Sequence, residues 1–250
     1  TSSSSYGRAI YFNAASVNDS IVGCTLNTGN QSSTSSNHSC ISTSTSGGNY
    51  NNLVIQNNTL NGSCGIYYLY SSSSTTTGFV LENNTINAYY IGTYYFYNFN
   101  GVTIRKNTVN ATGGASSYMG MYYIYLSGST PSDISYNSIK GFYGYGLYVS
   151  YPSGTSLTNK SKIMNNVIIS NPSTMAYYGM MVYYARYTDI INNTVITVGP
   201  NAASNSYGSG YFYQMYNGNR IMNNLFANYA KGNPINANYP SGYSDNEYDY

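Results

Sequence analysis

The chain has 250 residues, 34 of them Tyr and none of them Trp, and only 6% of its residues are charged. The net charge of +2 includes no basic cluster, so we expect no nucleic-acid partner, and no apolar run approaches the roughly 20 residues of a membrane-spanning helix. Aliphatic and aromatic residues are too plentiful and too regularly placed for a disordered chain. The composition therefore indicates an ordered protein whose surface is kept in water mainly by hydroxyl and amide groups.

The first 50 residues predict irregular outer coils. The segment 7–13 resembles the last strand of a coil, 20–27 resembles an asparagine block, and CISTSTS (40–46) follows. Residues 28–39 and 42–50 are Ser/Thr/Asn-rich loops. The segment 20–27 resembles the repeat that follows along the chain, with Cys24 in the place of its asparagine. The sequence starts with Thr1 rather than Met, and we interpret it as a mature or trimmed product.

A repeat begins near residue 51. Seven segments align without gaps on the pattern aliphatic-x-x-Asn-x-aliphatic: VIQNNTL (54–60), VLENNTI (80–86), TIRKNTV (103–109), DISYNSI (133–139), KIMNNVI (162–168), DIINNTV (189–195) and RIMNNLF (220–226). Their shared asparagines are Asn58, Asn84, Asn107, Asn137, Asn166, Asn193 and Asn224. Successive asparagines are 23 to 31 residues apart, which is the spacing of solenoid repeats.

Another apolar run follows each of the first six asparagine blocks after a polar loop. These runs are GIYYLY (65–70), IGTYYFY (91–97), GMYYIYL (120–126), GLYVSY (146–151), GMMVYY (179–184) and GYFYQMY (210–216). Val, Ile, Thr and Tyr dominate, and no helical periodicity extends beyond a turn or two. Each repeat then supplies three short strands, which predicts an all-β parallel β-helix of roughly 8–9 coils. We expect one domain over 1–250, with regular coils over 51–230 and a C-terminal tail or cap over 231–250.

The repeated asparagine has a structural interpretation. Stacked coils lie about 4.8 Å apart, so equivalent side chains lie one above the next. An inward Asn at a bend can donate its amide to the next coil and accept from the coil behind, which forms an amide ladder. Asn also tolerates the left-handed backbone of a sharp corner. We therefore expect the seven asparagines to hold the coils together and not to bind a ligand.

The run GVTIRKNTVNATG (101–113), followed by GMYYIYL, resembles a known repeat. It is similar to the right-handed parallel β-helix repeat shared by pectinases, other carbohydrate-processing enzymes, phage tailspikes and bacterial surface adhesins, over about residues 21–230. The C-terminal YPSGYSDNEYDY is similar to a segment that follows the last coils of long secreted bacterial repeat proteins. The resemblance implies a right-handed coil and an extracellular or cell-surface location, but it implies no particular activity.

The cysteines leave two alternatives. Cys40 and Cys64 are 24 residues apart, about one coil, and stacked positions are close enough for a disulfide. An extracellular compartment would permit a Cys40–Cys64 bridge. The alternative is three buried thiols, with Cys24 packed in the core in either case. No Cys or His spacing typical of a metal site occurs, so we expect no metal and no cofactor.

The carboxylates do not predict catalysis. The seven are Asp19, Glu82, Asp133, Asp189, Asp245, Glu247 and Asp249. Asp133 and Asp189 share an offset from the repeated Asn, but they are two coils apart and each precedes an inward aliphatic residue, so we expect both to point into solvent. The single histidine, His38, lies in a Ser/Thr loop and leaves no acid–base pair. We therefore predict no catalytic residue. The last three carboxylates form an acidic tail or, alternatively, a calcium site.

Alternation along the last strand of each coil predicts where the tyrosines point. The residues after the glycines should fill the core, namely Ile66, Met121, Leu147 and Met180. The next residues should face outward in one file along the axis, namely Tyr67, Tyr94, Tyr122 and Tyr148. The tyrosines that follow, Tyr68, Tyr95 and Tyr123, should face inward or line the corner. An exposed file of rings indicates an interface, or alternatively reflects only the preference of Tyr for strands.

Three functions are compatible with this sequence. We predict a non-catalytic extracellular structural or adhesive protein that self-assembles into a filament or surface layer through exposed strand edges and Tyr-rich faces. One alternative is a carbohydrate-binding module whose rings contact a surface polysaccharide. The other is a degraded or partial polysaccharide lyase or hydrolase. The expected partner is a second copy of the chain or a surface polysaccharide.

Overall fold

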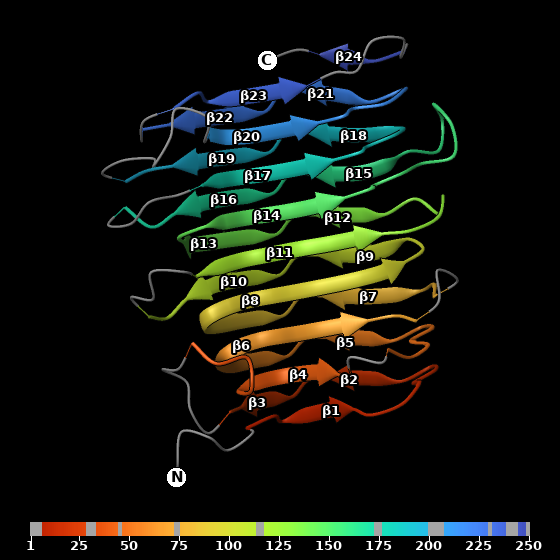
Figure 1. Ribbon diagram of the computed structural model, residues 1–250, viewed down its shortest axis with the longest axis vertical. Helices are drawn as coiled ribbons and strands as arrows, with labels where there is room; N and C mark the ends of the chain where they lie inside the picture. The colour runs from red at the N-terminus through yellow and green to blue at the C-terminus, as the bar shows by residue number, and fades with distance from the viewer. Residues whose placement is uncertain are drawn as a thin grey trace.

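The computed structural model describes residues 7–28, 34–44, 47–72, 76–113, 118–172, 177–199, 208–229, 232–238 and 245–248. Over these residues the protein is all β, and its parallel strands stack as a β-solenoid of about seven turns, fewer than the 8–9 coils expected from the sequence. The strands lie across the long axis of the molecule, and successive turns follow one another from the N-terminal to the C-terminal end (Figure 1). Each turn therefore meets the turn before it and the turn after it.

One sheet contains the first strand of each turn. Its nine strands are, in order, β2 (Ser20–Val22), β5 (Val54–Gln56), β7 (Phe79–Glu82), β9 (Val102–Arg105), β12 (Asp133–Ser135), β15 (Ser161–Met164), β18 (Thr188–Ile191), β21 (Arg220–Met222) and β24 (Glu247–Tyr248). All neighbours are parallel, and every strand except β24 contributes a buried aliphatic residue to a column that includes Ile55, Leu81, Ile104 and Ile134. Fully burying each of these side chains stabilises the fold by about 1.5–3 kcal/mol.

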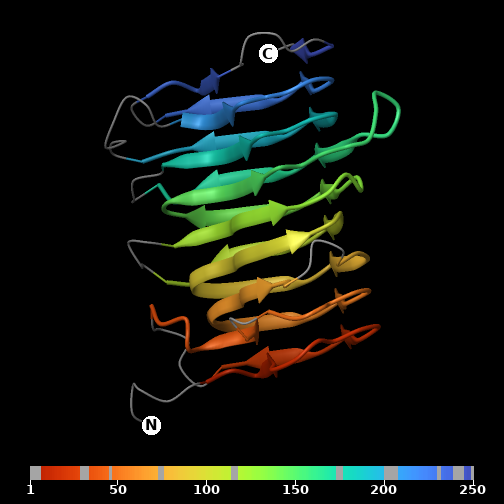
Figure 2. The same ribbon diagram turned by 45° about the vertical axis from the view of Figure 1, so that its right-hand side comes forward.

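The other sheet contains fifteen strands. They are β1 (Ile10–Phe12), β3 (Thr25–Asn27), β4 (Ser39–Thr43), β6 (Thr59–Tyr70), β8 (Thr85–Phe99), β10 (Thr108–Ala111), β11 (Met119–Leu126), β13 (Ser138–Phe142), β14 (Tyr145–Ser150), β16 (Val167–Ser170), β17 (Tyr178–Tyr183), β19 (Thr194–Thr197), β20 (Gly208–Tyr213), β22 (Leu225–Asn228) and β23 (Ile235–Asn238). It forms two rows, which are joined because β6 and β8 each continue through both of them (Figure 2). The row that contains β11, β14, β17 and β20 carries the tyrosine-rich runs.

A ladder of asparagine amides runs through the core between the two sheets. Its members are Asn58, Asn84, Asn107, Asn137, Asn166, Asn193 and Asn224, of which the first six are buried and Asn224 is half-buried. The Nδ2 of each of the first six donates to the Oδ1 of the asparagine on the next turn at 2.9–3.0 Å, and that of Asn224 donates to the carbonyl of Ile190. Asn107, for example, also donates to the carbonyl of Leu81, and its Oδ1 accepts the backbone N–H of Asn84. Every ladder amide from Asn58 to Asn193 is thus tied to the turns on both sides, and that of Asn224 to the turn before it.

The sharp corner before each ladder residue is made by the residue that precedes it. Asn57, Asn83, Lys106, Tyr136, Asn165, Asn192 and Asn223 all have φ between 55° and 57°. The ladder asparagines themselves have no positive φ, so the sequence-based assignment of the left-handed corner to them is wrong by one residue. Five of the seven corner residues are Asn because this side chain tolerates the left-handed region. In the Asn-Asn pairs, the first residue makes the corner and the second makes the ladder.

We expect the Asn107→Ala substitution to lower the free energy of unfolding by about 3 kcal/mol or more, measured by urea denaturation. The substitution leaves the N–H of Asn84 and the carbonyl of Leu81 buried without their partners. Asn110→Ala is the matched control, because Asn110 lies on the outer side of the next strand and its amide donates only to Asn87 there. That variant should lose about 1 kcal/mol or less. Equal losses in the two variants would contradict a special role of the ladder.

Candidate functional site

Glycines start the tyrosine-bearing runs because the backbones of successive turns come very close at this corner. Gly65, Gly92, Gly120, Gly146 and Gly179 lie one above another. A Cβ at Gly92 would lie 2.6 Å from the carbonyl oxygen of Gly120, and a Cβ at Gly120 would lie 2.4 Å from that of Gly146. No side chain fits there, so each turn needs Gly at this point. The residues that follow four of these glycines, Ile66, Met121, Leu147 and Met180, are fully buried, as expected.

Two consecutive tyrosines then face outward. In β6, Tyr67 and Tyr68 are both half-exposed, whereas Ile66 and Leu69 are fully buried. Tyr68 has a φ of 62°, and its equivalents Tyr95 and Tyr123 have φ values of 59° and 61°. A left-handed residue of this kind interrupts the alternation of the strand, as in a β-bulge. The prediction that Tyr68, Tyr95 and Tyr123 face inward or line the corner is therefore wrong.

The exposed tyrosines form three files along the axis. The first file is Tyr67, Tyr94, Tyr122 and Tyr148; the second is Tyr68, Tyr95 and Tyr123; the third is Tyr70, Tyr97, Tyr125, Tyr151 and Tyr184. Strand pairing places Tyr67 beside Tyr94 and Tyr94 beside Tyr122. The register shifts between β11 and β14, and the ring of Tyr148 lies 5.6 Å from that of Tyr122 and 5.3 Å from that of Tyr123. We call the three files together the tyrosine face.

Most rings within a file are stacked. Centroids of neighbours are 5.0 Å apart for Tyr67 and Tyr94, 4.8 Å for Tyr68 and Tyr95, and 4.5 Å for Tyr97 and Tyr125, with interplanar angles of 25°, 8° and 20°. These separations match the spacing of about 4.8 Å between strands, so the rings follow the stacking of the turns. Stacked neighbours cover one another's ring faces. What remains exposed is mainly the ring edges and the hydroxyl groups.

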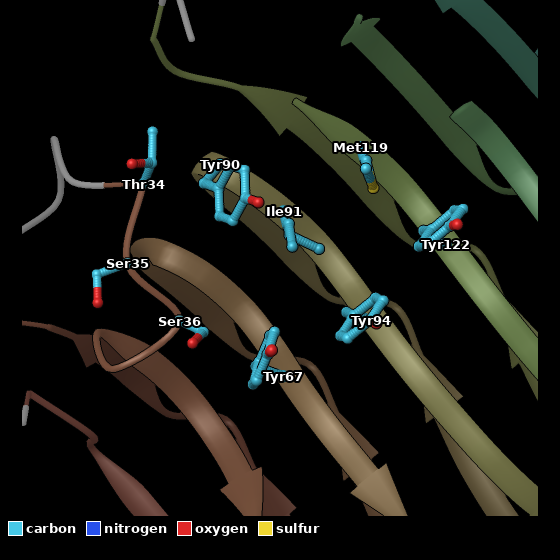
Figure 3. Close-up of a pocket in the computed structure, with 9 residues that line it drawn as sticks. All are labelled: Thr34, Ser35, Ser36, Tyr67, Tyr90, Ile91, Tyr94, Met119 and Tyr122. Atoms are coloured by element: carbon cyan, nitrogen blue, oxygen red, sulfur yellow. The ribbon is translucent and has the colours of Figure 1, made fainter. Parts of the chain in front are cut away.

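Two hollows adjoin the tyrosine face. One of about 420 Å³ lies beside the first file and is lined by Tyr67, Tyr94 and Tyr122 together with Tyr90 and Met119. Figure 3 shows these side chains on three successive strands, with the segment 34–36 beside them. The other, of about 450 Å³, is lined by the last tyrosines of the third file and by Arg186, whose Cζ lies 5.7 Å from the centroid of Tyr216. The surface is therefore ridged rather than flat.

Charged residues gather on the nine-stranded sheet instead. Strand pairing brings Asp133, Lys162, Asp189, Arg220 and Glu247 side by side in alternating sign. Asp189 is only 7% exposed, with Arg220 Nη2 at 2.6 Å and Lys160 Nζ at 3.3 Å. The prediction that Asp189 points into solvent is wrong, because the neighbouring turns supply two cations that cover it. Since Lys162 lies between Asp133 and Asp189, these carboxylates do not form a pair.

Within the described part of the chain, Glu82 has cationic partners of its own, and the single histidine is buried elsewhere. Glu82 lies 2.8 Å from Arg105 and 3.6 Å from Lys106. His38 is buried near the N-terminal end of the solenoid. No group of three His, Cys, Asp or Glu that could hold a metal is found in the part of the chain that the structure describes, and Asp249 lies outside that part.

Of the two alternatives for Cys40 and Cys64, the structure has the free thiols and not the disulfide. Cys24, Cys40 and Cys64 are free thiols, Cys24 half-buried and the other two fully buried. Strand pairing places Cys64 beside Ser39 rather than beside Cys40, so the two cysteines are offset by one residue. Burial raises the pKa of both Cys40 and Cys64 to about 12, which makes these thiols unreactive at neutral pH.

Comparison with family models, with curated proteins and with solved structures returns no match. The assignment to the β-solenoid fold accordingly rests on the repeat in the sequence and on the parallel pairing of the strands. Across the described ranges, no helix is long and apolar enough to cross a membrane.

We expect the tyrosine face to make the protein sensitive to alkali. Burial, reinforced by the charge of ionised neighbours, raises the pKa of Tyr95 and Tyr122 to about 12, whereas Tyr in an unfolded chain ionises near pH 10. The unfolded state therefore loses protons first, so the stability is complete below about pH 10 and falls as the pH rises toward 12. Urea denaturation at increasing pH measures this. The double variant Tyr95→Phe/Tyr122→Phe should show a smaller loss, and an unchanged loss would contradict the assignment.

We expect Asp189→Asn to lower the free energy of unfolding by about 2–3 kcal/mol at neutral pH, because Lys160, with a side chain only 9% exposed, loses its counterion. Burial by itself raises the pKa of Asp189, but the hydrogen bond from Arg220 and the charge of Lys160 outweigh it, and the pKa is lowered. This stabilisation is present above about pH 4 and is lost as the pH falls further, so the two proteins should converge in acid. Asp133→Asn, which affects a contact with Ser135, is the control and should change little. A constant difference at all pH values would argue against the ion pairs.

Proposed function

We propose that this protein is a non-catalytic structural or adhesive protein of the cell exterior, and that it assembles with copies of itself through the tyrosine face. It would then act in the manner of the bacterial surface repeat proteins that its repeat resembles. The observation that carries the proposal is a continuous surface of tyrosines on strands that contain no charged residue.

The absence of charge supports an interface. The strands of the tyrosine face, β6, β8, β11, β14, β17 and β20, contain no Asp, Glu, Lys or Arg. The ion pairs of Glu82 and Asp189 lie on the other sheet. Cores of protein interfaces are depleted of charge and enriched in Tyr. The distribution of side chains over the two sheets therefore favours the tyrosine face as the contact surface.

The rigidity of the face also supports binding. Tyr has only two side-chain torsions, and here each ring is held by its neighbours in the file. Little conformational entropy remains to be lost when a partner arrives. The exposed hydroxyls can donate and accept hydrogen bonds across the contact.

The direction of the files bears on the geometry of assembly. The files run along the solenoid axis, so copies that meet through them lie side by side, as in a surface layer or a bundle of filaments. Pairing of exposed strand edges is the second route of assembly in this proposal. Both routes use surfaces that a parallel β-solenoid leaves open.

A surface polysaccharide is the alternative partner. The hollow beside the first file, which hydroxyl-bearing side chains line, favours this alternative. The covered ring faces count against it, because a sugar that stacks on an aromatic ring needs that face to be free. The pairing of Asp189 and Glu82 with cations supports a non-catalytic protein over a lyase or hydrolase.

Sedimentation velocity over a range of concentrations tests the proposal. The wild-type protein should associate as its concentration rises, and the triple variant Tyr67→Ala/Tyr94→Ala/Tyr122→Ala should stay monomeric. Tyr136→Ala is the matched control, because Tyr136 is 60% exposed but lies outside the face. It should associate like the wild type. Each lost ring pair costs about 0.5–1.5 kcal/mol, so thermal melting must confirm that the triple variant is folded.

Two results would contradict self-assembly. One is equal association of the wild type and the triple variant. The other is a wild type that stays monomeric but is retained on insoluble glycans, with retention lost in the triple variant. That second result would support the carbohydrate-binding alternative.

A further inference from the structure

The tyrosine face concentrates groups that one-electron oxidants attack. The chain has 34 Tyr and no Trp, and the thiols of Cys40 and Cys64 are fully buried. Buried thiols with raised pKa values are poor targets for oxidation. The half-buried Cys24 lies outside the strands of the tyrosine face, so an oxidant that reaches this face from solvent meets mainly phenol groups, beside the thioether of Met119.

The files present the reactive atoms of these phenols outward. Stacking covers the ring faces, for example between Tyr95 and Tyr123, whose rings are 5.2 Å apart and within 7° of parallel. The hydroxyl oxygen and the two ring carbons beside it lie at the exposed edge. Removing one electron and the hydroxyl proton leaves a neutral radical that is shared between this oxygen and these carbons. The atoms that can form a new bond therefore lie at the surface.

A radical can also move along a file. Ring centroids are 4.5 Å apart for Tyr97 and Tyr125 and 4.8 Å apart for Tyr68 and Tyr95. Transfer of a hydrogen atom from one phenol to a neighbouring phenoxyl exchanges identical species, so it has almost no energetic cost. The pKa of Tyr95 and Tyr122, raised by burial to about 12, keeps these phenols protonated at neutral pH and able to supply that hydrogen. A radical formed at one tyrosine can thus reach another that faces a partner.

We infer that the tyrosine face is a site of oxidative cross-linking, at which a haem peroxidase with hydrogen peroxide joins two copies of the chain through dityrosine bonds. The inference rests on the proposed self-assembly, because two faces must meet for the bond to form. Six neighbouring strands span roughly 24 Å along the axis and the files roughly 10 Å across it. This is small beside the roughly 800 Å² that each partner buries in a stable interface. A covalent bond makes such a weak contact permanent.

The reaction balances with peroxide as the oxidant. One hydrogen peroxide takes one hydrogen atom from each of two phenols and becomes two water molecules. The two phenoxyls couple through the ring carbons next to oxygen, which forms one carbon–carbon bond. Each of these carbons then loses its hydrogen as a proton while the oxygen regains one, so both phenols are restored. The product has lost two hydrogen atoms per bond.

The test treats the whole protein with a haem peroxidase and hydrogen peroxide. Covalent dimers on denaturing gels, dityrosine fluorescence and mapping of the joined peptides by mass spectrometry are the readouts. The face variant replaces Tyr94, Tyr95, Tyr97, Tyr122, Tyr123 and Tyr125 by Phe, which keeps the rings and removes the hydroxyls. The matched control replaces Tyr11, Tyr136 and Tyr229 by Phe, since these are 42%, 60% and 74% exposed but lie outside the face.

We expect covalent dimers in the wild type and in the control variant, with the mapped bonds on the tyrosine face. The face variant should lose about half of the dimer, because it keeps six of the twelve tyrosines of the face. Bonds that map mainly to Tyr136 and Tyr229 would overturn the inference, because solvent exposure alone would then determine which tyrosines are cross-linked. Bonds only within one chain would also overturn it. If sedimentation shows reversible association but peroxidase yields no bond on the face, cross-linking is refuted while self-assembly stands.

Discussion

The buried amide ladder is the interaction on which the rest of the structure depends. Each ladder asparagine from Asn58 to Asn193 is buried and is bonded to the turn before it and to the turn after it, as Asn107 is. A slip of one residue between turns would leave these amides unsatisfied and would turn every strand side chain to the opposite face. Because the ladder holds the register, the glycines stack where the backbones nearly touch and the tyrosines stack where the strand faces solvent. The stacking of the tyrosines on the surface thus depends on the hydrogen bonds of the buried amide ladder.

The two sheets have different surfaces because the same register sorts different side chains. On the nine-stranded sheet it places charges of opposite sign beside each other, so the few ionic groups of the chain neutralise one another locally. On the other sheet it places Tyr beside Tyr. The tyrosine-bearing strands therefore have neither charge repulsion nor ion pairs that would oppose the approach of a similar surface. Charged residues and tyrosines are separated onto different sheets because each turn repeats the residue pattern of the turn before it.

The fold was predictable from the sequence because a repeat reports directly on stacking. The aliphatic-x-x-Asn-x-aliphatic blocks identified the ladder, and the glycine runs identified the strand that bears the tyrosines. Features that depend on backbone conformation were not predictable in this way. The positive φ at Tyr68 breaks the alternation on which its inward assignment relied, and the left-handed corner belongs to Asn83 rather than to Asn84.

Contacts between turns were harder still to predict. The offset of Cys40 from Cys64 follows from the register of β4 and β6, which a spacing of 24 residues does not determine. The burial of Asp189 depends on Lys160 and Arg220, which come from other turns. A rule that considers each strand alone, such as alternation, has no information about cations on neighbouring turns. The stacked geometry of the tyrosine rings is a property of the same kind.

The register shift between β11 and β14 has a geometric consequence. Up to Tyr123 the first two files run side by side, and the ring of Tyr148 then lies against the rings of both Tyr122 and Tyr123. Beyond this point the rings continue from Tyr122 to Tyr145, Tyr178 and Tyr211. The files therefore change course at the shift, and the N-terminal and C-terminal halves of the face differ in relief. A surface that fits one half does not fit the other in the same way, so the face has a direction along the axis.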